Sequence, residues 1–401
     1  PSLKVDIRTL HLPGVLKPHP FDPSDGLDMT EIAALAVVNN PKLKVARAER
    51  GIARAQLLAA GLLPDPKWDL SLDHPTGAGV QAYSLSLGYP IQRLITRRAD
   101  VKAAKAAVRK ADLDLLWQEW QVAQKAKLLF VQWHMQEKRL HLIKAFKGRS
   151  PFSYEKAMKA MDRGELTLET GSPFLAAMMD ADKRLNALER EHLQTRHELL
   201  ALLGLSPAMR LPLVKIPPLP PWPSFQASLV RHRPDLLALK AGYESQESRL
   251  RSAVLARFPG LTFGLDRARD TDGVHTLGFS LTLRFPLWNR NRGEIAVQKA
   301  TRERLRAEYQ ARLNQAVGDI RRLQEAQALL RKQHTRLKEQ LSALEPIVAK
   351  AREAFASGNL DALRYVSLEE NLLNRREDMI GLEQASWEVY IASQTLAGSL
   401  W

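Results

Sequence analysis

The sequence predicts a mainly α-helical protein with a small β part, and three observations lead to this fold class. Long segments rich in Ala, Leu, Lys and Arg carry narrow apolar stripes, which are typical of helices that pack in pairs. Two short segments alternate strictly between apolar and small polar residues, which indicates β-strands. The same succession of segments occurs twice, about 195 residues apart. We therefore expect two internal repeats.

The clearest strand lies at 275–285, where every second residue is apolar. The alternation covers about ten residues, the length that crosses a bilayer as a tilted strand. A lone strand of this kind would more often belong to the half-buried sheet of a soluble protein, but the pattern occurs again at 80–90. Both strands follow a partner, so we predict hairpins at 67–90 and 260–286. The predicted lipid-facing residues are Tyr83, Leu85, Leu87, Tyr89, Leu277, Phe279, Leu281, Leu283 and Phe285.

The two copies organise the whole chain. Proline and the lack of any period predict an extended arm at 1–26, and the proline-dense segment 206–223 predicts a linker. Repeat 1 covers 27–205, with its hairpin at 67–90 and a tip near residue 164, and repeat 2 covers 224–401, with its hairpin at 260–286 and a tip near residue 358. In each repeat we expect a helix, the hairpin, a long helix, the tip and a last helix.

Single residues predict where these helices begin and end. The first helix is expected to begin at Asp28 or Thr30 and to be interrupted at Pro41. The helix after the first tip is expected to run from about Pro173 to Leu203. The long helix of repeat 2 is expected to begin near Glu294 and to be disturbed at Pro346. About 60 residues in each long helix give a rod of roughly 90–100 Å, which must pack against other long helices.

The composition limits the classes of function. A net charge of +15 suggests nucleic acid or an anionic membrane surface as a partner, but the basic residues alternate with Glu along helical segments, which favours solvated helix faces. No run approaches 18 apolar residues, so we expect no transmembrane helix. The absence of Cys excludes disulfides and thiolate metal sites, and this sequence holds no cysteine that could carry an N-terminal lipid.

Four membrane-length strands cannot close a barrel, because the smallest closed barrels need about eight. Unpaired strand edges are not tolerated in lipid. If the hairpins insert, several chains must share one β-barrel, and their long helices can form an α-helical barrel beside it. The sequence therefore predicts an oligomer.

Two motifs carry a resemblance to a known family. Residues 233–236 read RPDL, and residues 285–295 read FPLWNRNRGEI at the end of the second hairpin. With the duplicated plan they resemble the TolC-type outer-membrane efflux channels, and the second motif resembles the heavy-metal, CzcC-like branch. The resemblance implies a homotrimer with a transmembrane β-barrel and an α-helical barrel, located in the bacterial outer membrane and extending into the periplasm. It also implies a periplasmic adaptor protein and an inner-membrane pump of the RND type as partners.

The same resemblance implies roles for the two tips. The residues expected to contact the adaptor are Gly164, Glu165, Leu166, Gly358, Asn359 and Leu360. Some members place gate aspartates six and nine residues after the second tip glycine, where this chain has Arg364 and Ser367. An arginine at a constriction disfavours cations, which conflicts with a metal-ion substrate. The expected function is passive export of heavy-metal cations, with drugs or other small organic molecules as the alternative cargo. A soluble basic coiled-coil scaffold that binds nucleic acid is a distant alternative.

Motifs for catalysis are missing from the sequence. We find no phosphate-binding loop, no nucleophile elbow and no closely spaced pair of metal-binding histidines, so we expect no enzyme activity, no cofactor and no metal site. Glu369 and Glu370 are adjacent on an expected helix and therefore diverge, and we expect both to be surface charges.

Overall fold

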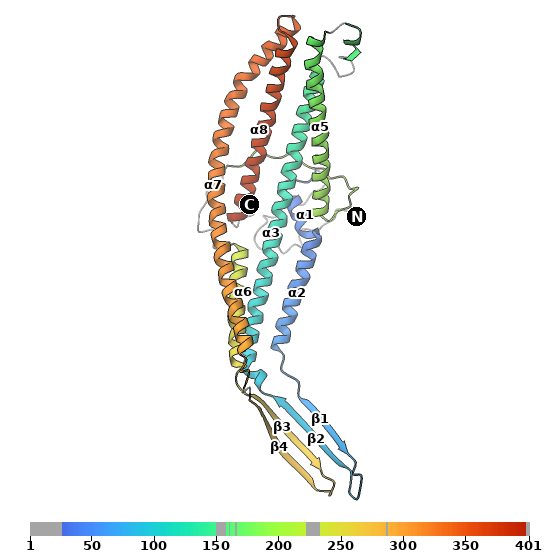
Figure 1. Ribbon diagram of the computed structural model, residues 1–401, viewed down its shortest axis with the longest axis vertical. Helices are drawn as coiled ribbons and strands as arrows, with labels where there is room; N and C mark the ends of the chain where they lie inside the picture. The colour runs from blue at the N-terminus through green and yellow to red at the C-terminus, as the bar shows by residue number, and fades with distance from the viewer. Residues whose placement is uncertain are drawn as a thin grey trace. The chain divides into compact units, whose positions relative to one another are not determined.

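The structure is a computed structural model that describes residues 26–149, 158–159, 161–164, 167–221, 233–285 and 288–397. It is mainly helical with one small antiparallel sheet, as the sequence predicts (Figure 1). The chain forms two compact units. Unit 1 contains Pro1–Lys44, Gln118–Val230 and Ala316–Trp401, and unit 2 contains Val45–Trp117 and Arg231–Gln315.

After the short first helix, the order of helix, two strands, long helix and helix occurs twice. The long helices have 58 and 65 residues, close to the expected length. The elements are α1 (Met29–Asn39), α2 (Pro41–Gly61), β1 (Lys67–Asp73), β2 (Ala82–Pro90), α3 (Gln92–Arg149), α5 (Leu168–Leu202), α6 (Pro234–Leu255), β3 (Gly260–Arg269), β4 (His275–Arg284), α7 (Arg292–Ala356) and α8 (Ala362–Ala397).

The two hairpins of unit 2 join into one sheet with the strand order β1-β2-β3-β4. All three pairings are antiparallel, and the central one places β2 against β3. Directly paired residues share a face of the sheet, so one transverse row contains Trp68, Leu87, Leu265 and Phe279. The register therefore collects the apolar positions of all four strands on one side.

Unit 1 has its main core where α1 meets α3 and α5. Asp28 caps α1 in a capping box: its side chain accepts from the backbone N–H of Glu31 at 2.7 Å, and the Glu31 carboxylate accepts from the N–H of Asp28 at 2.9 Å. Asn40 separates α1 from α2, and its side-chain Nδ2 donates to the Leu202 carbonyl at 2.9 Å. The buried apolar residues here are Leu27, Ile32, Leu35, Ala36, Ala126, Leu129, Phe130, Leu199 and Leu203.

A second buried cluster joins α3 to α8 in unit 1. Val131 and Met135 of α3 pack with Trp387 and Ile391 of α8, and all four are at most 2% exposed. An ion pair also joins the two helices beside this cluster, where Lys138 Nζ of α3 lies 2.6 Å from Glu383 Oε1 of α8. The narrow apolar stripes therefore pack helix against helix, as the sequence predicts.

In unit 2, the RPD motif holds the start of α6. Arg233 is buried, and its Nε and Nη2 donate to Oδ1 and Oδ2 of Asp235 at 3.0 and 2.7 Å. Its guanidinium lies 4.9 Å from the ring centre of Trp117 on α3. Asp235 also accepts from the N–H of Leu236 at 3.0 Å. The motif thus anchors the first turn of α6 to α3.

Several expected helix boundaries are wrong. α5 begins at Leu168, because Thr167 caps it by accepting from the N–H of Thr170 at 3.2 Å, and Pro173 lies inside the helix. α7 passes through Pro346 without a break. Pro346 is exposed, so the carbonyl left without an amide partner one turn earlier can be solvated. The extended arm and the segment 222–232 lie outside the described residues.

Candidate functional site

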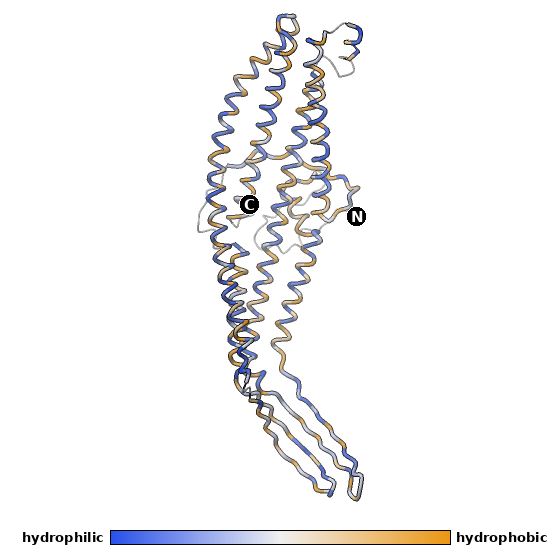
Figure 2. Tube along the Cα trace, in the orientation of Figure 1, coloured by the Kyte–Doolittle hydropathy of each residue, from blue (hydrophilic) through white to orange (hydrophobic). Residues whose placement is uncertain are grey.

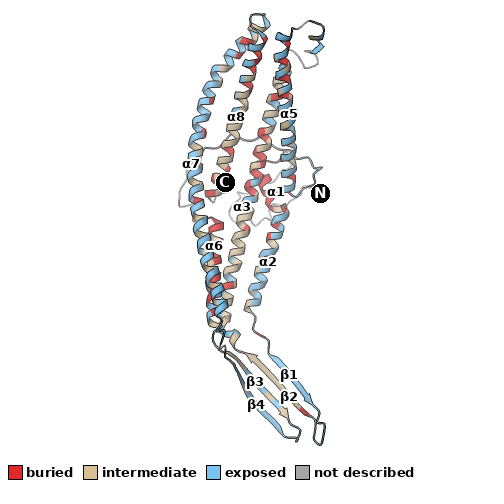
Figure 3. Ribbon diagram, in the orientation of Figure 1, coloured by how far each residue is buried: buried red, intermediate tan, exposed pale blue. Residues whose placement is uncertain are grey.

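The sheet of unit 2 carries a large exposed apolar face. Leu277 and Phe279 of β4 are 80% and 79% exposed, and Leu70 of β1 is 65% exposed. The predicted lipid-facing residues of β2, from Tyr83 to Tyr89, lie on this same face and are partly covered by their neighbours. Figure 2 shows apolar residues along all four strands, and Figure 3 shows that β4 is mostly exposed. An apolar surface of this extent requires lipid or protein to cover it.

The opposite face of the sheet is small and polar. Its central row contains Asp69, Ser86, Asp266 and Gly278, one from each strand. The Ser86 hydroxyl donates to the Asp266 carboxylate. Small, polar and acidic side chains are typical of a water-filled lumen.

Both edges of this sheet are open within the described residues, because β1 pairs only with β2 and β4 only with β3. Helix α2 leads into the edge strand β1, and the edge strand β4 leads into helix α7. In unit 2 each of these helices has a line of exposed residues along one side, which we call its seam. On α2 and at the residue after its end, the exposed residues of the seam are Val45, Ala48, Ile52, Ala55, Ala59 and Leu62. On α7 they are Gly293, Ala296, Ala300, Ala307 and Ala311. Steps of three, four and seven residues along these helices are the spacing of a coiled-coil contact, and the large residues Val45 and Ile52 of the α2 seam match the small residues of the α7 seam.

In unit 1, the second tip is a tight turn between α7 and α8. Gly358 has φ +75°, and its N–H donates to the Phe355 carbonyl at 3.0 Å, while the N–H of Asn359 donates to the Ala354 carbonyl at 2.7 Å. This pair of bonds is a Schellman motif, in which a glycine takes the left-handed conformation. Gly164 has φ +72° at the first tip, whereas Glu165 and Leu166 lie outside the described residues.

We expect Gly358→Ala to destabilise the tip by about 1–2 kcal/mol, because a Cβ is strained at positive φ. No heavy atom lies within 4 Å of that Cβ, so the cost comes from the backbone alone. The matched control is Gly318→Ala in the interior of α7, which also has open space and a helical φ and should gain about 0.5–1 kcal/mol. Hydrogen exchange of the amides around residue 358 measures the effect. Equal protection in the two variants would contradict it.

The two predicted gate residues lie on the exposed side of α8. Arg364 has a 79% exposed side chain, and its Nε lies 3.2 Å from Oδ2 of the nearby Asp361. Ser367 is also exposed, and the exposed line continues through Asn371 and Arg375 in steps of four. The structure therefore presents a polar, partly basic stripe that starts beside the second tip.

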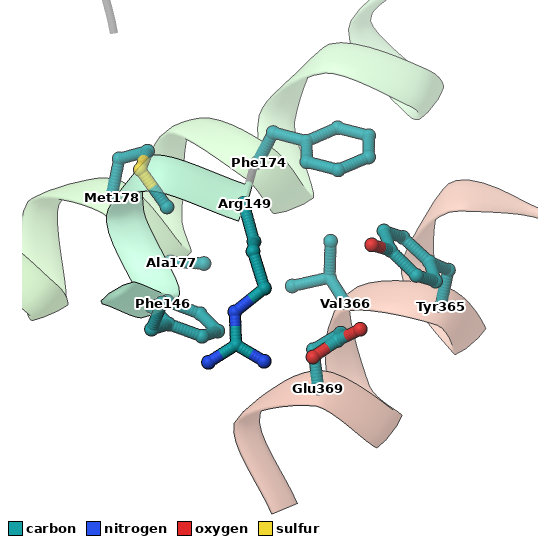
Figure 4. Close-up of a pocket in the computed structure, with 8 residues that line it drawn as sticks. All are labelled: Phe146, Arg149, Phe174, Ala177, Met178, Tyr365, Val366 and Glu369. Carbon is teal, nitrogen blue, oxygen red and sulfur yellow. The ribbon is translucent and has the colours of Figure 1, made fainter. Parts of the chain in front are cut away.

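The other side of α8 packs into an aromatic cluster. Tyr365 stacks on Phe355 of α7 with ring centres 4.5 Å apart, and Phe174 of α5 lies 6.1 Å from Tyr365. Leu360 of the tip packs against the same cluster. Figure 4 shows Phe174, Tyr365 and their neighbours around a cavity of about 20 Å³, which has room for one water molecule. The cluster holds the ends of three helices together at the second tip.

The expectation that Glu369 is a surface charge is wrong. Glu369 is 8% exposed, and its Oε2 accepts a hydrogen bond from Nη2 of Arg352 on α7 at 2.9 Å. Burial and the Glu369 charge raise the pKa of Tyr365. Burial and the charge of Asp180 also raise the pKa of Glu370. The partner of Glu369 comes from another helix, 17 residues earlier, so the spacing on α8 alone could not reveal it.

Metal ligands do not gather in the part of the chain that the structure describes, where no three His, Asp or Glu side chains could hold an ion together. Among the described helices, none combines the length and the apolar composition needed to cross a membrane.

The chain was compared with known protein families, sequences and solved structures. Residues 227–400 match the family "Outer membrane efflux protein". No curated protein sequence matches the chain. Among solved structures, the outer membrane protein VceC of Vibrio cholerae is 17% identical with a TM-score of 0.77, over 92% of this chain and 96% of VceC. CmeC of Campylobacter jejuni is 17% identical with a TM-score of 0.78, over 92% and 85% of the two chains. CusC is 15% identical with a TM-score of 0.75, over 94% and 93%.

The chain thus shares the fold of solved outer-membrane channels over nearly its whole length.

Proposed function

We propose that this chain is the outer-membrane channel of a tripartite efflux system and works as a homotrimer without enzymatic activity. The observation that carries the proposal is the four-stranded sheet, which combines one exposed apolar face, one polar face and two open edges. Lipid covers the apolar face, and two further copies supply the strands that pair with β1 and β4. Twelve strands then enclose a lumen lined by the polar face.

The exposed helix seams support a head-to-tail contact between copies. The large residues of the α2 seam fit the small residues of the α7 seam of the next copy, in the manner of knobs entering holes. Because α2 leads into β1 and β4 leads into α7, the same neighbour that pairs the strands also packs these helices. A repeated contact of this heterologous kind closes into a ring of three when it rotates each copy by one third of a turn.

Transport through such a channel is passive. An inner-membrane pump, which we propose to be of the RND type, supplies the energy, and a periplasmic adaptor contacts the two tips around Gly164 and Gly358. The adaptor contact includes Glu165, Leu166, Asn359 and Leu360 in this proposal. The two repeats, 27–205 and 224–401, would contribute one tip each.

The cargo follows from two opposing observations. The segment 285–295 resembles the motif of heavy-metal exporters, and the aspartates of the polar sheet face favour cations, so we propose metal cations as the first candidate. The basic stripe that starts at Arg364 favours organic molecules or anions instead. Metal resistance of a strain that lacks its own channel, complemented with this chain, separates the two: resistance to drugs without resistance to metals would remove the first candidate.

Ion selectivity tests whether Arg364 lines a constriction of the channel. If three copies of its exposed guanidinium line a constriction, Arg364→Glu reverses three charges and should raise cation over anion permeability by about tenfold. The control is Arg375→Glu, which lies about three turns further along the same exposed line, where the effect should be smaller. Reversal potentials in planar bilayers under a salt gradient measure this ratio. An unchanged ratio in Arg364→Glu would remove Arg364 from the constriction.

The assembly itself is tested by mass and by crosslinking. Detergent-extracted protein should have about three times the chain mass of 45.1 kDa after bound detergent is subtracted. Because the sequence has no Cys, one cysteine at Ser71 in β1 and one placed in turn along β4 give a covalent trimer only when the two edges meet. A monomer that never enters the membrane fraction would refute the channel.

A further inference from the structure

Two arginines interrupt the apolar face of the sheet at the ends of the hairpins. Arg267 pairs with Leu85 and Leu277, and Arg269 pairs with Tyr83 and His275, so both side chains share the face of the lipid-facing residues. Arg267 is exposed, and Arg269 is partly buried between its neighbours. The Tyr83 and His275 rings that flank Arg269 lie 6.3 Å apart. Two guanidinium groups thus occupy adjacent rows of an otherwise apolar surface.

Neither arginine has a counter-ion among the described residues. Neither side chain forms an ion pair with a described residue, and Nε of Arg269 is buried without a hydrogen-bond acceptor. The carboxylate next in the chain, Asp270, is occupied, because its Oδ1 accepts from the backbone N–H groups of Asp272 and Val274 at 2.9 Å each. Asp266 projects from the opposite face, where Ser86 binds it. Two guanidinium charges without a counter-ion among the described residues, on one face of the sheet, leave a place for an anionic partner.

The depth of these residues identifies the partner. Ten residue steps separate His275 from Phe285, which is roughly 34 Å along the strand and about 25 Å along the normal at the usual barrel tilt. This height equals that of the apolar band of membrane barrels. Phe285 lies at the other end of the band, and the 93% exposed Trp288 follows it in the chain. The rows of Arg269 and Arg267 therefore reach the headgroup level, where an arginine on the lipid face costs little and its stem can extend toward the interface.

We infer that Arg267 and Arg269 bind the phosphate of an anionic lipid in the leaflet that the hairpin ends reach. Paired guanidinium groups suit phosphate oxygens because each offers a fork of N–H donors. The exposed Leu277 beside Arg267 contacts the acyl chain, so the surface matches both parts of a phospholipid. This inference rests on the proposed membrane insertion of the sheet.

The test uses the full channel in detergent, titrated with phosphatidylglycerol and, separately, with phosphatidylcholine of the same chain length. The double variant Arg267→Gln, Arg269→Gln should lower the affinity for phosphatidylglycerol about 10- to 30-fold and leave that for phosphatidylcholine nearly unchanged. Arg284→Gln is the matched control, because Arg284 pairs with Gly260 on the polar face at the other end of β4. It should bind both lipids as the parent does.

Equal affinity for phosphatidylglycerol in the parent and the double variant would overturn the inference. Inorganic phosphate that binds the parent as tightly as phosphatidylglycerol would also overturn it, since the lipid would then add nothing. The mass of each variant is measured in the same detergent. A trimer without lipid selectivity refutes only the lipid site, whereas a soluble monomer refutes the proposed channel.

Discussion

Leu281→Arg should prevent or strongly reduce assembly in the outer membrane. Leu281 is 60% exposed at the middle of the apolar face of β4. An arginine on the lipid face costs about 2–4 kcal/mol per chain at the bilayer midplane, and a trimer would carry this cost three times. The measurement is the amount of heat-resistant trimer in outer-membrane fractions.

Thr282→Arg is the control for that substitution. Thr282 is the next residue on the same strand and is also exposed, but it projects from the polar face and pairs with Thr262. It should leave trimer yield close to that of the parent and change only conductance. If Thr282→Arg abolished the trimer while Leu281→Arg did not, the two faces of the sheet would have to be exchanged.

Lys127→Met should stabilise the protein near neutral pH. Lys127 of α3 is 3% exposed, and its Nζ lies 3.5 Å from Gln394 Oε1 of α8. Burial lowers the pKa of Lys127 from 10.5 to about 8, against an opposing attraction from Asp28. This shift corresponds to on the order of 3 kcal/mol of destabilisation while the amine must be charged. Since Met fills a similar volume without the charge, we expect a gain of about 1–3 kcal/mol.

The sign of the pH dependence follows from the lowered pKa. Between pH 8 and 10.5 the unfolded chain binds more protons at Lys127 than the folded chain does, so the free energy of unfolding rises with pH across this window. The penalty is complete below the window and absent above it. Thermal unfolding midpoints in detergent should rise across the window for the parent more than for Lys127→Met. Lys144→Met, on the exposed side of α3, is the control and should keep the slope of the parent.

Local patterns predicted most of this fold because each depends on residues close in sequence. The alternation around Phe279 predicts its strand, and Gly358 predicts the turn between α7 and α8. Pairing between distant segments could not be read in the same way. The sequence contains no local sign that β2 meets β3, that Arg352 reaches Glu369, or that Arg269 faces the same side as Tyr83, since each depends on the register between separate elements.

Helix boundaries failed where two signals competed. Pro173 suggests the start of a helix, but α5 begins after the capping residue Thr167, six residues earlier. The helix tolerates Pro173 because a proline near the start of a helix removes few backbone hydrogen bonds. Pro346 suggests a break in the long helix, but α7 continues through it. Because the position is exposed, water can replace the backbone hydrogen bond that proline cannot donate.

The pairing of β2 with β3 also determines the order in which the sheet can form. Each hairpin closes through a short turn, whereas Ser86 and Asp266 meet across a separation of 180 positions. Closing so long a loop is slow and entropically costly compared with forming a hairpin. The first hairpin therefore keeps the second edge of β2 unpaired until β3 is present, which requires nearly two thirds of the chain. Any factor that shields that strand in the interval acts on the folding yield and leaves the stability of the finished protein unchanged.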